Sequence, residues 1–249
     1  MTDFEEKAFL ARIDDMINLS ERRGMVFSHF LNEAQQMLAQ SELCRLRCEN
    51  YCFFGGAENT DRNILCVFSD YCRPENSDFP VTCITFRYKP QYKLSHRDFL
   101  GVLTSLNLKR ESIGDILIGE GVAQVFAENS VAGAITDEVR KIGSVGVSLS
   151  TDEPVLLSKE QSFSEIHGTA ASMRLDCILS LATRLSRSKV MPLISSGNVQ
   201  VNYRQQENAS FVMKEGDIFS ARGYGKFRIG EASGVSKKGR IHIVVLKYC

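Results

Sequence analysis

The spacing of apolar residues divides the chain into helical and extended stretches. Residues 4–24 carry apolar side chains close to a helical period, and Gly24 suits the end of a helix. The same period predicts a second helix over residues 27–43, with Ser28 or Asn32 as its N-cap. Residues 51–68 hold two apolar runs around a glycine turn, which indicates a small hairpin or two short strands. A helical unit with a small β element is therefore expected over residues 1–80.

Residues 81–151 follow a different pattern. Extended runs at 81–88, 114–119, 121–128 and 144–150 are interrupted by helical stretches at 95–107 and 130–143. Ser95 is the expected N-cap of the first helix, with Asp98 three residues later in capping-box geometry. The order β-α-β-β-α-β is that of ferredoxin-like units, a fold that RNA-recognition modules share. The fold class predicted for the whole chain is α+β.

RNA-recognition modules stack bases on aromatic residues of their central strands. The third extended run, 121–128, offers only Phe126, so base stacking by this unit is not favoured. The stretch 86–97 is a better contact candidate, because basic residues (Arg87, Lys89, Lys93 and Arg97) alternate there with Tyr88 and Tyr92. A solvated strand exit is an alternative of at least equal weight.

Residues 152–172 are polar and mixed, which predicts a linker that carries at most one strand, with His167 at the surface. Residues 173–249 show helical stretches at 174–183 and 185–197, with Arg174 and Asp176 outside the apolar face of the first and Ser186 as the cap of the second. Gly197 suits the helix end, and strands follow, the first with Val199 and Val201 inward. Pro192 interrupts the second helical stretch, where it is expected to kink the helix.

Composition excludes several classes of protein. Hydrophobic residues make up 43% of the 249 residues, without a signal peptide or an apolar run long enough to cross a membrane. The eight cysteines include no C-x-x-C pair, so neither a zinc site nor a disulfide framework is expected. Cys66, Cys72 and Cys83 sit in or near apolar runs, where a thiol is expected to behave as a small buried hydrophobe. A reducing cytoplasm is the simplest location.

The net charge of zero hides an asymmetry. Residues 173–249 hold 13 Lys and Arg against 5 Asp and Glu, a net charge of +8, and the remainder of the chain carries −8. A basic end on an acidic body indicates contact with a polyanion, although a solvated basic face has the same composition.

The basic end also resembles a known family. The run Arg174-Leu175-Asp176-x-x-Leu179, then Ser186-Arg187-Ser188, Leu193-Ile194, Gly197, Val199-x-Val201-Asn202, Gly216-Asp217 and Arg222-Gly223 is similar to the RNA-binding domain named after ribosomal small-subunit protein S-four, also called the αL motif. The order of units along the whole chain resembles the YlmH-type proteins. The implied organisation is an N-terminal α/β unit (1–80), a ferredoxin-like domain (81–151), a linker (152–172) and an S-four-type RNA-binding domain (173–249).

The resemblance implies a non-catalytic protein that binds structured rRNA or tRNA on the ribosomal large subunit, in quality control of stalled peptidyl-tRNA complexes, with a link to cell division. It implies no cofactor and no DNA partner. A helix N-terminus attracts phosphate, and basic residues in a first turn are otherwise disfavoured. The expected RNA contacts are Arg174, Arg184, Arg187, Ser188, Lys189, Asn202, Arg204, Arg222, Lys226 and Arg228.

Two other classes of function remain compatible with the sequence. Pseudouridine synthases carry a catalytic aspartate in an Arg-Leu-Asp string, which this chain has at Asp176, but here the string opens the binding module itself and no clustered catalytic set accompanies it. The other class is a protein-binding scaffold that uses the acidic body.

Overall fold

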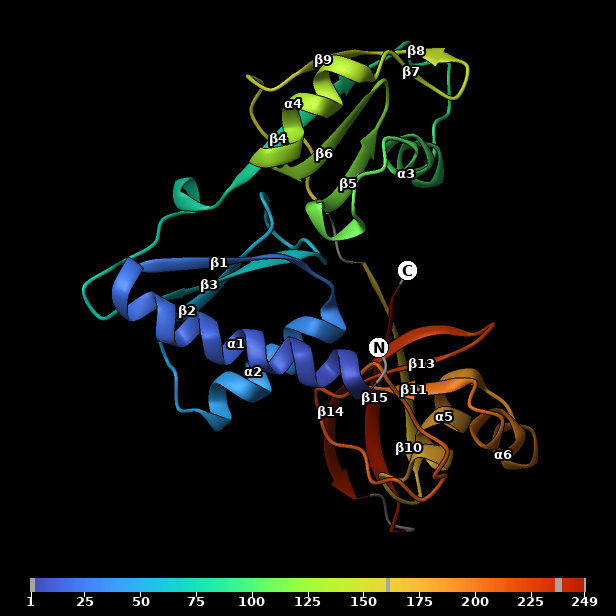
Figure 1. Cartoon of the computed structure of the whole chain (residues 1–249). Coiled ribbons are helices and arrows are strands. Elements are labelled where there is room, and N and C mark those ends of the chain that lie inside the picture. The colour runs from blue at the N-terminus through green and yellow to red at the C-terminus, as the bar shows by residue number, and fades with distance from the viewer. Residues whose placement is uncertain (1–2, 160–161, 236–238, 249) are drawn as a thin grey trace. The chain divides into compact units, whose positions relative to one another are not determined.

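The computed structural model describes residues 3–159, 162–235 and 239–248. The chain forms two compact units, Met1–Glu160 and Gln161–Cys249. Helices and antiparallel sheets occur in both units, which confirms the α+β class (Figure 1). The two N-terminal units expected from the sequence lie together in the first compact unit.

The N-terminal part packs two helices against a three-stranded antiparallel sheet. Its elements are α1 (Asp3–Arg23), β1 (Met25–Leu31), α2 (Glu33–Arg45), β2 (Tyr51–Phe54) and β3 (Asn63–Phe68), with strand order β1-β3-β2. Gly24 ends α1 with φ +83°. The helix predicted from residue 27 is wrong in its first part, because residues 25–31 form a strand. Asn32, one of the two predicted N-caps, does cap α2, since its side chain accepts from the Gln35 backbone N–H at 3.0 Å.

The middle part forms a four-stranded antiparallel sheet of order β5-β6-β4-β9. Its elements follow the predicted alternation of strands and helices: β4 (Val81–Arg87), α3 (His96–Ser105), β5 (Ile113–Gly119), β6 (Val122–Glu128), α4 (Asn129–Glu138) and β9 (Ser148–Ser150). Asp98 accepts from the Ser95 backbone N–H at 2.8 Å, as the capping box requires. The helix α4 ends at Glu138, before Gly143, and a short hairpin of β7 (Lys141–Ile142) and β8 (Val145–Gly146) follows it.

Both faces of this sheet are covered. Alternate residues such as Phe86 and Val125 pack against α3 and α4 on one face. On the other face, Phe126 and Leu117 join a cluster with Phe30 and Ile64 of the N-terminal sheet. Gly56 sits so close to the Phe126 ring that a Cβ atom there would lie 2.2 Å from it, and its φ is +99°. The N-terminal part therefore closes the second face of the sheet.

Hydrogen bonds also join the N-terminal part to the middle part. The Arg62 guanidinium donates to the carbonyl oxygens of Phe30 (3.1 Å), Arg110 (3.1 Å) and Ile113 (2.9 Å). Asp115 accepts from the backbone N–H groups of Asp61 (2.7 Å) and Arg62 (3.1 Å). Burial lowers the pKa of Arg62 to about 10, helped by the nearby charge of Arg110. Arg62 still carries its charge at neutral pH, which its three carbonyl acceptors stabilise.

Gln124 forms hydrogen bonds that hold the segment after β9 against the sheet face that the N-terminal part covers. Its side chain is fully buried; the amide nitrogen donates to Thr85 Oγ1 (3.0 Å) and to the Pro154 carbonyl (2.9 Å). Its oxygen accepts from the backbone N–H groups of Leu156 (2.8 Å) and Leu157 (2.9 Å). Residues 154–157 thus cover part of the sheet.

Replacing Gln124 with Ala is expected to lower the free energy of unfolding of the first unit by about 2 kcal/mol, because it leaves buried donors and acceptors without partners. Amide hydrogen exchange of Leu156 and Leu157 is the direct measurement, and their exchange should accelerate. The matched control is Gln91→Ala, at an exposed position, which should change neither quantity.

The second unit contains a six-stranded antiparallel sheet and two helices. The strands are β10 (Phe163–Ala170), β11 (Val199–Val201), β12 (Arg204–Gln205), β13 (Ile218–Ala221), β14 (Gly225–Val235) and β15 (Ile241–Tyr248), in the order β10-β15-β14-β13-β11-β12. Residues 163–170, assigned to the linker from the sequence, form β10 and pair along their whole length with β15. The one strand that the sequence allowed in this segment is therefore β10, because pairing with a long, apolar partner strand orders residues that include few apolar side chains of their own.

Cys66 is fully buried, as predicted, and burial raises the pKa of its thiol to about 12. Cys72 and Cys83 are only half-buried. Across residues 3–159, 162–235 and 239–248, no three His, Cys, Asp or Glu side chains gather closely enough to hold a metal ion. Within those same ranges, no helix has the length and hydrophobicity needed to cross a membrane.

Candidate nucleic-acid interface

The predicted basic residues of the second unit gather first at the junction of two helices. Helix α5 (Leu175–Thr183) ends at Arg184, which adopts the left-handed conformation with φ +59°. Helix α6 (Arg187–Ser195) starts three residues after Arg184, with Ser186 at the N-cap position, as predicted, although its side chain makes no capping hydrogen bond. The apolar faces of both helices lie on the sheet, with Ile178, Leu179, Val190 and Ile194 fully buried. The short turn thus places Arg184, Arg187, Ser188 and Lys189 beside one another along the chain, all at exposed positions.

Asp176 lies under this junction and is 1% exposed. The sequence placed this side chain outside the apolar face of the helix and did not predict its burial. The carboxylate accepts from Nε and Nη2 of Arg174 at 3.2 Å each, and from Nη2 of Arg187. These two arginines come from the residue before α5 and the first residue of α6. Asp176 is buried because its charge is compensated on both sides.

The arginines determine the ionisation of Asp176. Burial raises the pKa of this carboxyl, but hydrogen bonds from Arg187 and Arg174 outweigh burial and lower the pKa to about 2. The same contact raises the pKa of Arg187. Arg187 at a helix start is thus stabilised by an anion of the protein itself. The side chains of Arg174 and Arg187 stay 41% and 59% exposed, and a guanidinium has five N–H donors, so both can bind a further acceptor.

Arg184 and Lys189 differ from Arg187. Neither forms an ion pair with any side chain that the structure describes, and both are exposed. Ser188 Oγ lies 2.8 Å from Ser186 Oγ. The first turn of α6 therefore presents a lysine whose charge no carboxylate compensates, next to the N-terminal end of the helix dipole.

Pro192 lies inside helix α6, and the helix continues on both sides of it. The proline is exposed, and its carbonyl accepts from the Ser196 backbone N–H at 3.0 Å. The residue removes one N–H in a nine-residue helix, yet α6 runs from Arg187 to Ser195 as one element.

The predicted contacts on the strands do not join this cluster. Lys226 and Arg228 of β14 alternate with Phe227 and Ile229, which belong to the core beneath the helices. Because successive side chains of a strand point to opposite faces, Lys226 and Arg228 point away from α5 and α6. Lys226 Nζ lies 4.6 Å from the centre of the Tyr248 ring and 5.1 Å from that of Tyr203.

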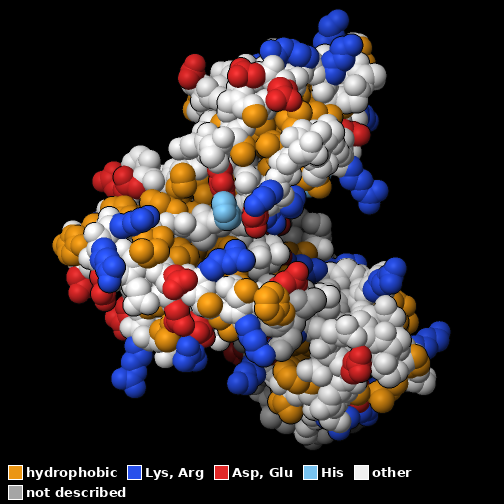
Figure 2. All heavy atoms as spheres, in the orientation of Figure 1, with side chains coloured by type: hydrophobic (Ala, Val, Ile, Leu, Met, Phe, Trp, Pro, Cys, Tyr) orange, Lys and Arg blue, Asp and Glu red, His pale blue; other side chains and the backbone are white. Residues whose placement is uncertain are grey.

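The remaining predicted residues lie at turns and an edge. Asn202 donates to Asp217 Oδ1 at 2.9 Å and accepts from the Ile218 backbone N–H at 3.0 Å, so it fixes the turn after β11. Arg204 lies on the edge strand β12, and Arg222 is exposed at the β13–β14 turn. Figure 2 shows Lys and Arg side chains on the visible face of this unit with few acidic ones between them.

Sequence reasoning missed the role of Asp176. The available signal was an acidic residue in a first helical turn, two positions after an arginine, within a strongly basic segment.

His167, predicted to be a surface residue, is exposed on β10, and its Nε2 lies 2.9 Å from Glu165 Oε2.

Of the basic residues and tyrosines in the stretch 86–97, the first two are engaged within the protein and the others are exposed. Arg87 forms an ion pair with Glu153, and the Tyr88 ring is buried against Phe99. Lys89, Tyr92, Lys93 and Arg97 are exposed. Phe126 is fully buried and cannot stack on a base.

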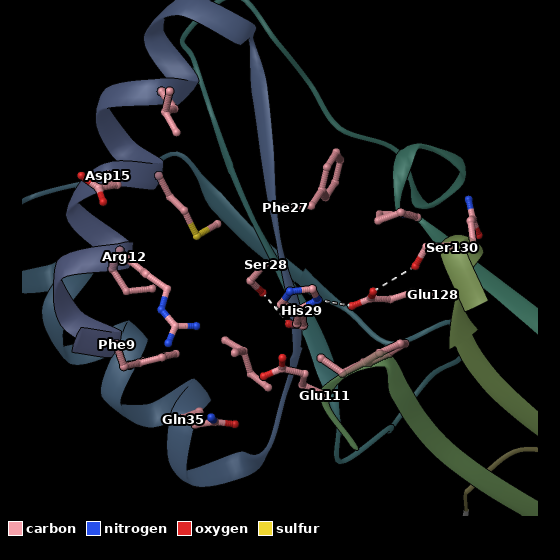
Figure 3. A pocket seen from close by; sticks show the side chains of 17 residues that line it. Phe9, Arg12, Asp15, Phe27, Ser28, His29, Gln35, Glu111, Glu128 and Ser130 are labelled. Atoms are coloured by element: carbon pink, nitrogen blue, oxygen red, sulfur yellow. Dashed lines mark hydrogen bonds and ion pairs between the residues drawn. The ribbon is translucent and has the colours of Figure 1, made fainter. Parts of the chain in front are cut away.

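A cavity of about 480 Å³ lies in the first unit between α1 and β1 (Figure 3). Its walls include Phe9, Ile13 and Phe27, and its polar side carries His29, whose Nδ1 lies 2.6 Å from Glu128 Oε1. Ser130 donates to the other Glu128 oxygen at 3.4 Å. None of the RNA contacts expected from the sequence lines this cavity.

Comparison with known proteins gives three findings. Residues 74–154 match the family described as "Putative RNA-binding domain in YlmH". The chain is 29% identical over 239 residues to the "Ribosome-associated protein quality control protein P2" of Bacillus subtilis (strain 168), covering 95% of this chain and 93% of that protein. The solved structure of "Cell division protein ylmH from Streptococcus pneumoniae" matches with 25% identity and a TM-score of 0.50, covering 61% of this chain and 94% of that one.

Proposed function

The chain is a YlmH-type protein, and from this premise we propose that it is a non-catalytic RNA-binding protein of ribosome-associated quality control. Its RNA is proposed to be structured rRNA or tRNA on the large ribosomal subunit, in complexes with stalled peptidyl-tRNA. The name of the Bacillus relative supports the ribosomal assignment, and the name of the streptococcal one supports a link to cell division.

The α5–α6 junction is the observation that carries this proposal. It combines uncompensated Arg184 and Lys189 with two arginines that Asp176 holds in place. Positioned guanidinium groups and a helix N-terminus suit phosphate oxygens. We propose that residues 173–249, together with β10, form the S-four-type RNA-binding domain, with Arg174, Arg184, Arg187, Ser188 and Lys189 as its main contacts. Arg204, Arg222, Lys226 and Arg228 are proposed as peripheral contacts, and Asn202 as a residue that shapes the turn.

A modifying enzyme is the weaker candidate. The carboxylate of Asp176 is 1% exposed and paired with two arginines, so it is not available to attack a nucleobase. A protein-binding scaffold is likewise less favoured, because the basic junction fits a polyanion better than it fits an ordinary protein surface.

Crosslinking in cells with sequencing of the bound RNA tests the proposal. We expect enrichment of large-subunit rRNA and tRNA over messenger RNA. Enrichment of messenger RNA alone would overturn the ribosomal assignment, and a partner recovered equally well after nuclease treatment, without crosslinked RNA, would favour the scaffold.

A further inference from the structure

The middle part of the chain matches a putative RNA-binding domain, yet the surface that such modules normally use is closed here. RNA-recognition modules with this strand order stack bases on the sheet face opposite their helices. In this chain that face carries Thr85, Gln124 and Phe126, all of which are fully buried. The N-terminal sheet and residues 154–157 cover it.

Hydrogen bonds hold this cover on the sheet. The Arg62 guanidinium makes three hydrogen bonds to carbonyl groups, and Asp115 accepts two more from the backbone of the 61–62 turn. Removing the cover would expose Phe126 and break the hydrogen bonds of Arg62 to the Arg110 and Ile113 carbonyls and those of Asp115 to the 61–62 turn. RNA that reaches this domain must therefore meet another surface.

The β4–α3 loop, residues 88–97, has the composition and the geometry for that contact. No acidic residue interrupts it, and Lys89, Lys93 and Arg97 are exposed and form no ion pair with any described residue. Tyr92 is 42% exposed. The nearest acidic side chain in sequence, Asp98, is engaged with the Ser95 backbone N–H and hydroxyl at 2.8 and 2.7 Å.

The loop is also fixed at both ends. Tyr88 is buried; its backbone N–H donates to the Gly121 carbonyl at 3.0 Å and its hydroxyl to the Gly119 carbonyl at 3.1 Å. A turn closed by Tyr92 N–H donating to the Lys89 carbonyl (3.0 Å) follows, and Leu94 packs against the domain core. A pre-ordered basic loop with a partly exposed aromatic ring has the features of single-strand recognition, in which phosphates meet cations and a base stacks on the ring.

We infer that the 88–97 loop, and not the sheet face, is the RNA-contacting surface of the middle domain, and that it binds an unpaired nucleotide segment through Lys89, Lys93, Arg97 and a base stacked on Tyr92. This inference rests on the proposed RNA-binding function and adds a second contact to that of α5 and α6.

The test uses the full chain and fragments of bacterial large-subunit rRNA. The triple variant Lys89→Ala, Lys93→Ala, Arg97→Ala should bind about tenfold more weakly, and the slope of log affinity against log salt should shrink by about 2, since each single-strand phosphate contact contributes about 0.7. The matched control is Arg87→Ala, whose side chain is already paired with Glu153; its affinity should stay close to wild type. Tyr92→Phe should retain binding, and Tyr92→Ala should lose it by several-fold.

Ultraviolet crosslinking of the same complexes locates the contact. We expect RNA attached to the peptide that contains Tyr92. Attachment to the peptide that contains Phe126, or wild-type affinity of the triple variant, would overturn the inference while leaving RNA binding by the chain intact. Failure of the wild-type chain to bind any fragment would instead overturn the proposed function.

Discussion

Replacing Asp176 with Asn is expected to lower the free energy of unfolding of the second unit by about 3 kcal/mol, the lower end of the cost of breaking a buried ion pair. The lower end applies because Arg174 and Arg187 stay partly exposed and can be hydrated once the carboxylate is lost. Urea unfolding followed through the nuclear magnetic resonance signals of α5 and α6 measures this quantity without averaging over the first unit.

The pH dependence of the wild-type chain gives an independent check. The pKa of Asp176 is about 2 in the folded chain and about 3.9 in an unfolded one. A lowered folded-state pKa stabilises the fold above the unfolded value, and this contribution is lost as the pH falls from about 4 to about 2. The loss should be about 2 kcal/mol for wild type and absent in Asp176→Asn. Equal acid sensitivity of the two chains would show that Arg174 and Arg187 do not hold a buried carboxylate.

The second large effect concerns RNA affinity. The double variant Arg184→Ala, Lys189→Ala should bind structured RNA at least about tenfold more weakly, with a salt slope reduced by about 2, because each phosphate contact on a duplex contributes about 0.9. Its stability should change little, since neither side chain has an ionic partner among the residues described. Salt-titrated binding of the full chain is the measurement.

Lys214→Ala provides the matched control for that experiment. Lys214 is an exposed lysine of the same unit, outside the predicted contact set, so its loss should leave both affinity and slope close to wild type. Arg187→Ala would be a poor substitute for the double variant, because it also removes a partner of buried Asp176. A double variant that binds as tightly as Lys214→Ala would remove the junction from the interface.

The sequence predicts the elements of this chain well where one periodicity dominates. Most strands and helices of the middle part, the cap positions at Ser95 and Ser186, and the inward Val199 and Val201 follow from local patterns. The exception in the middle part is residues 141–146, predicted as a helix end and a strand start, which form the β7–β8 hairpin. Residues 27–31 were misassigned, because an apolar pair such as Phe30-Leu31 fits a helix face as well as a strand, and only pairing with β3 decides between them. The sequence allowed one strand within residues 152–172 but not its bounds, since the order of β10 comes from pairing with β15.

In the candidate site, too, the sequence shows which residues are present but not how they are arranged. The basic residues are visible in the sequence, but their division between two faces is not. Lys226 and Arg228 alternate with the core residues Phe227 and Ile229, so they point away from the helices, and only the fold shows which face of the sheet the helices cover. The burial of Asp176 was not predicted because helical periodicity ignores charge compensation, and Arg187, eleven residues later, is what permits its burial.

Mapping amide chemical shifts of the full chain during titration with a structured large-subunit rRNA fragment tests the central claim most directly. We expect the largest changes in the second unit to fall on Arg184–Lys189 and on Arg174, at the α5–α6 junction, and to vanish at high salt. Binding that leaves the signals of this junction unchanged, or changes that persist undiminished at high salt, would contradict the central claim.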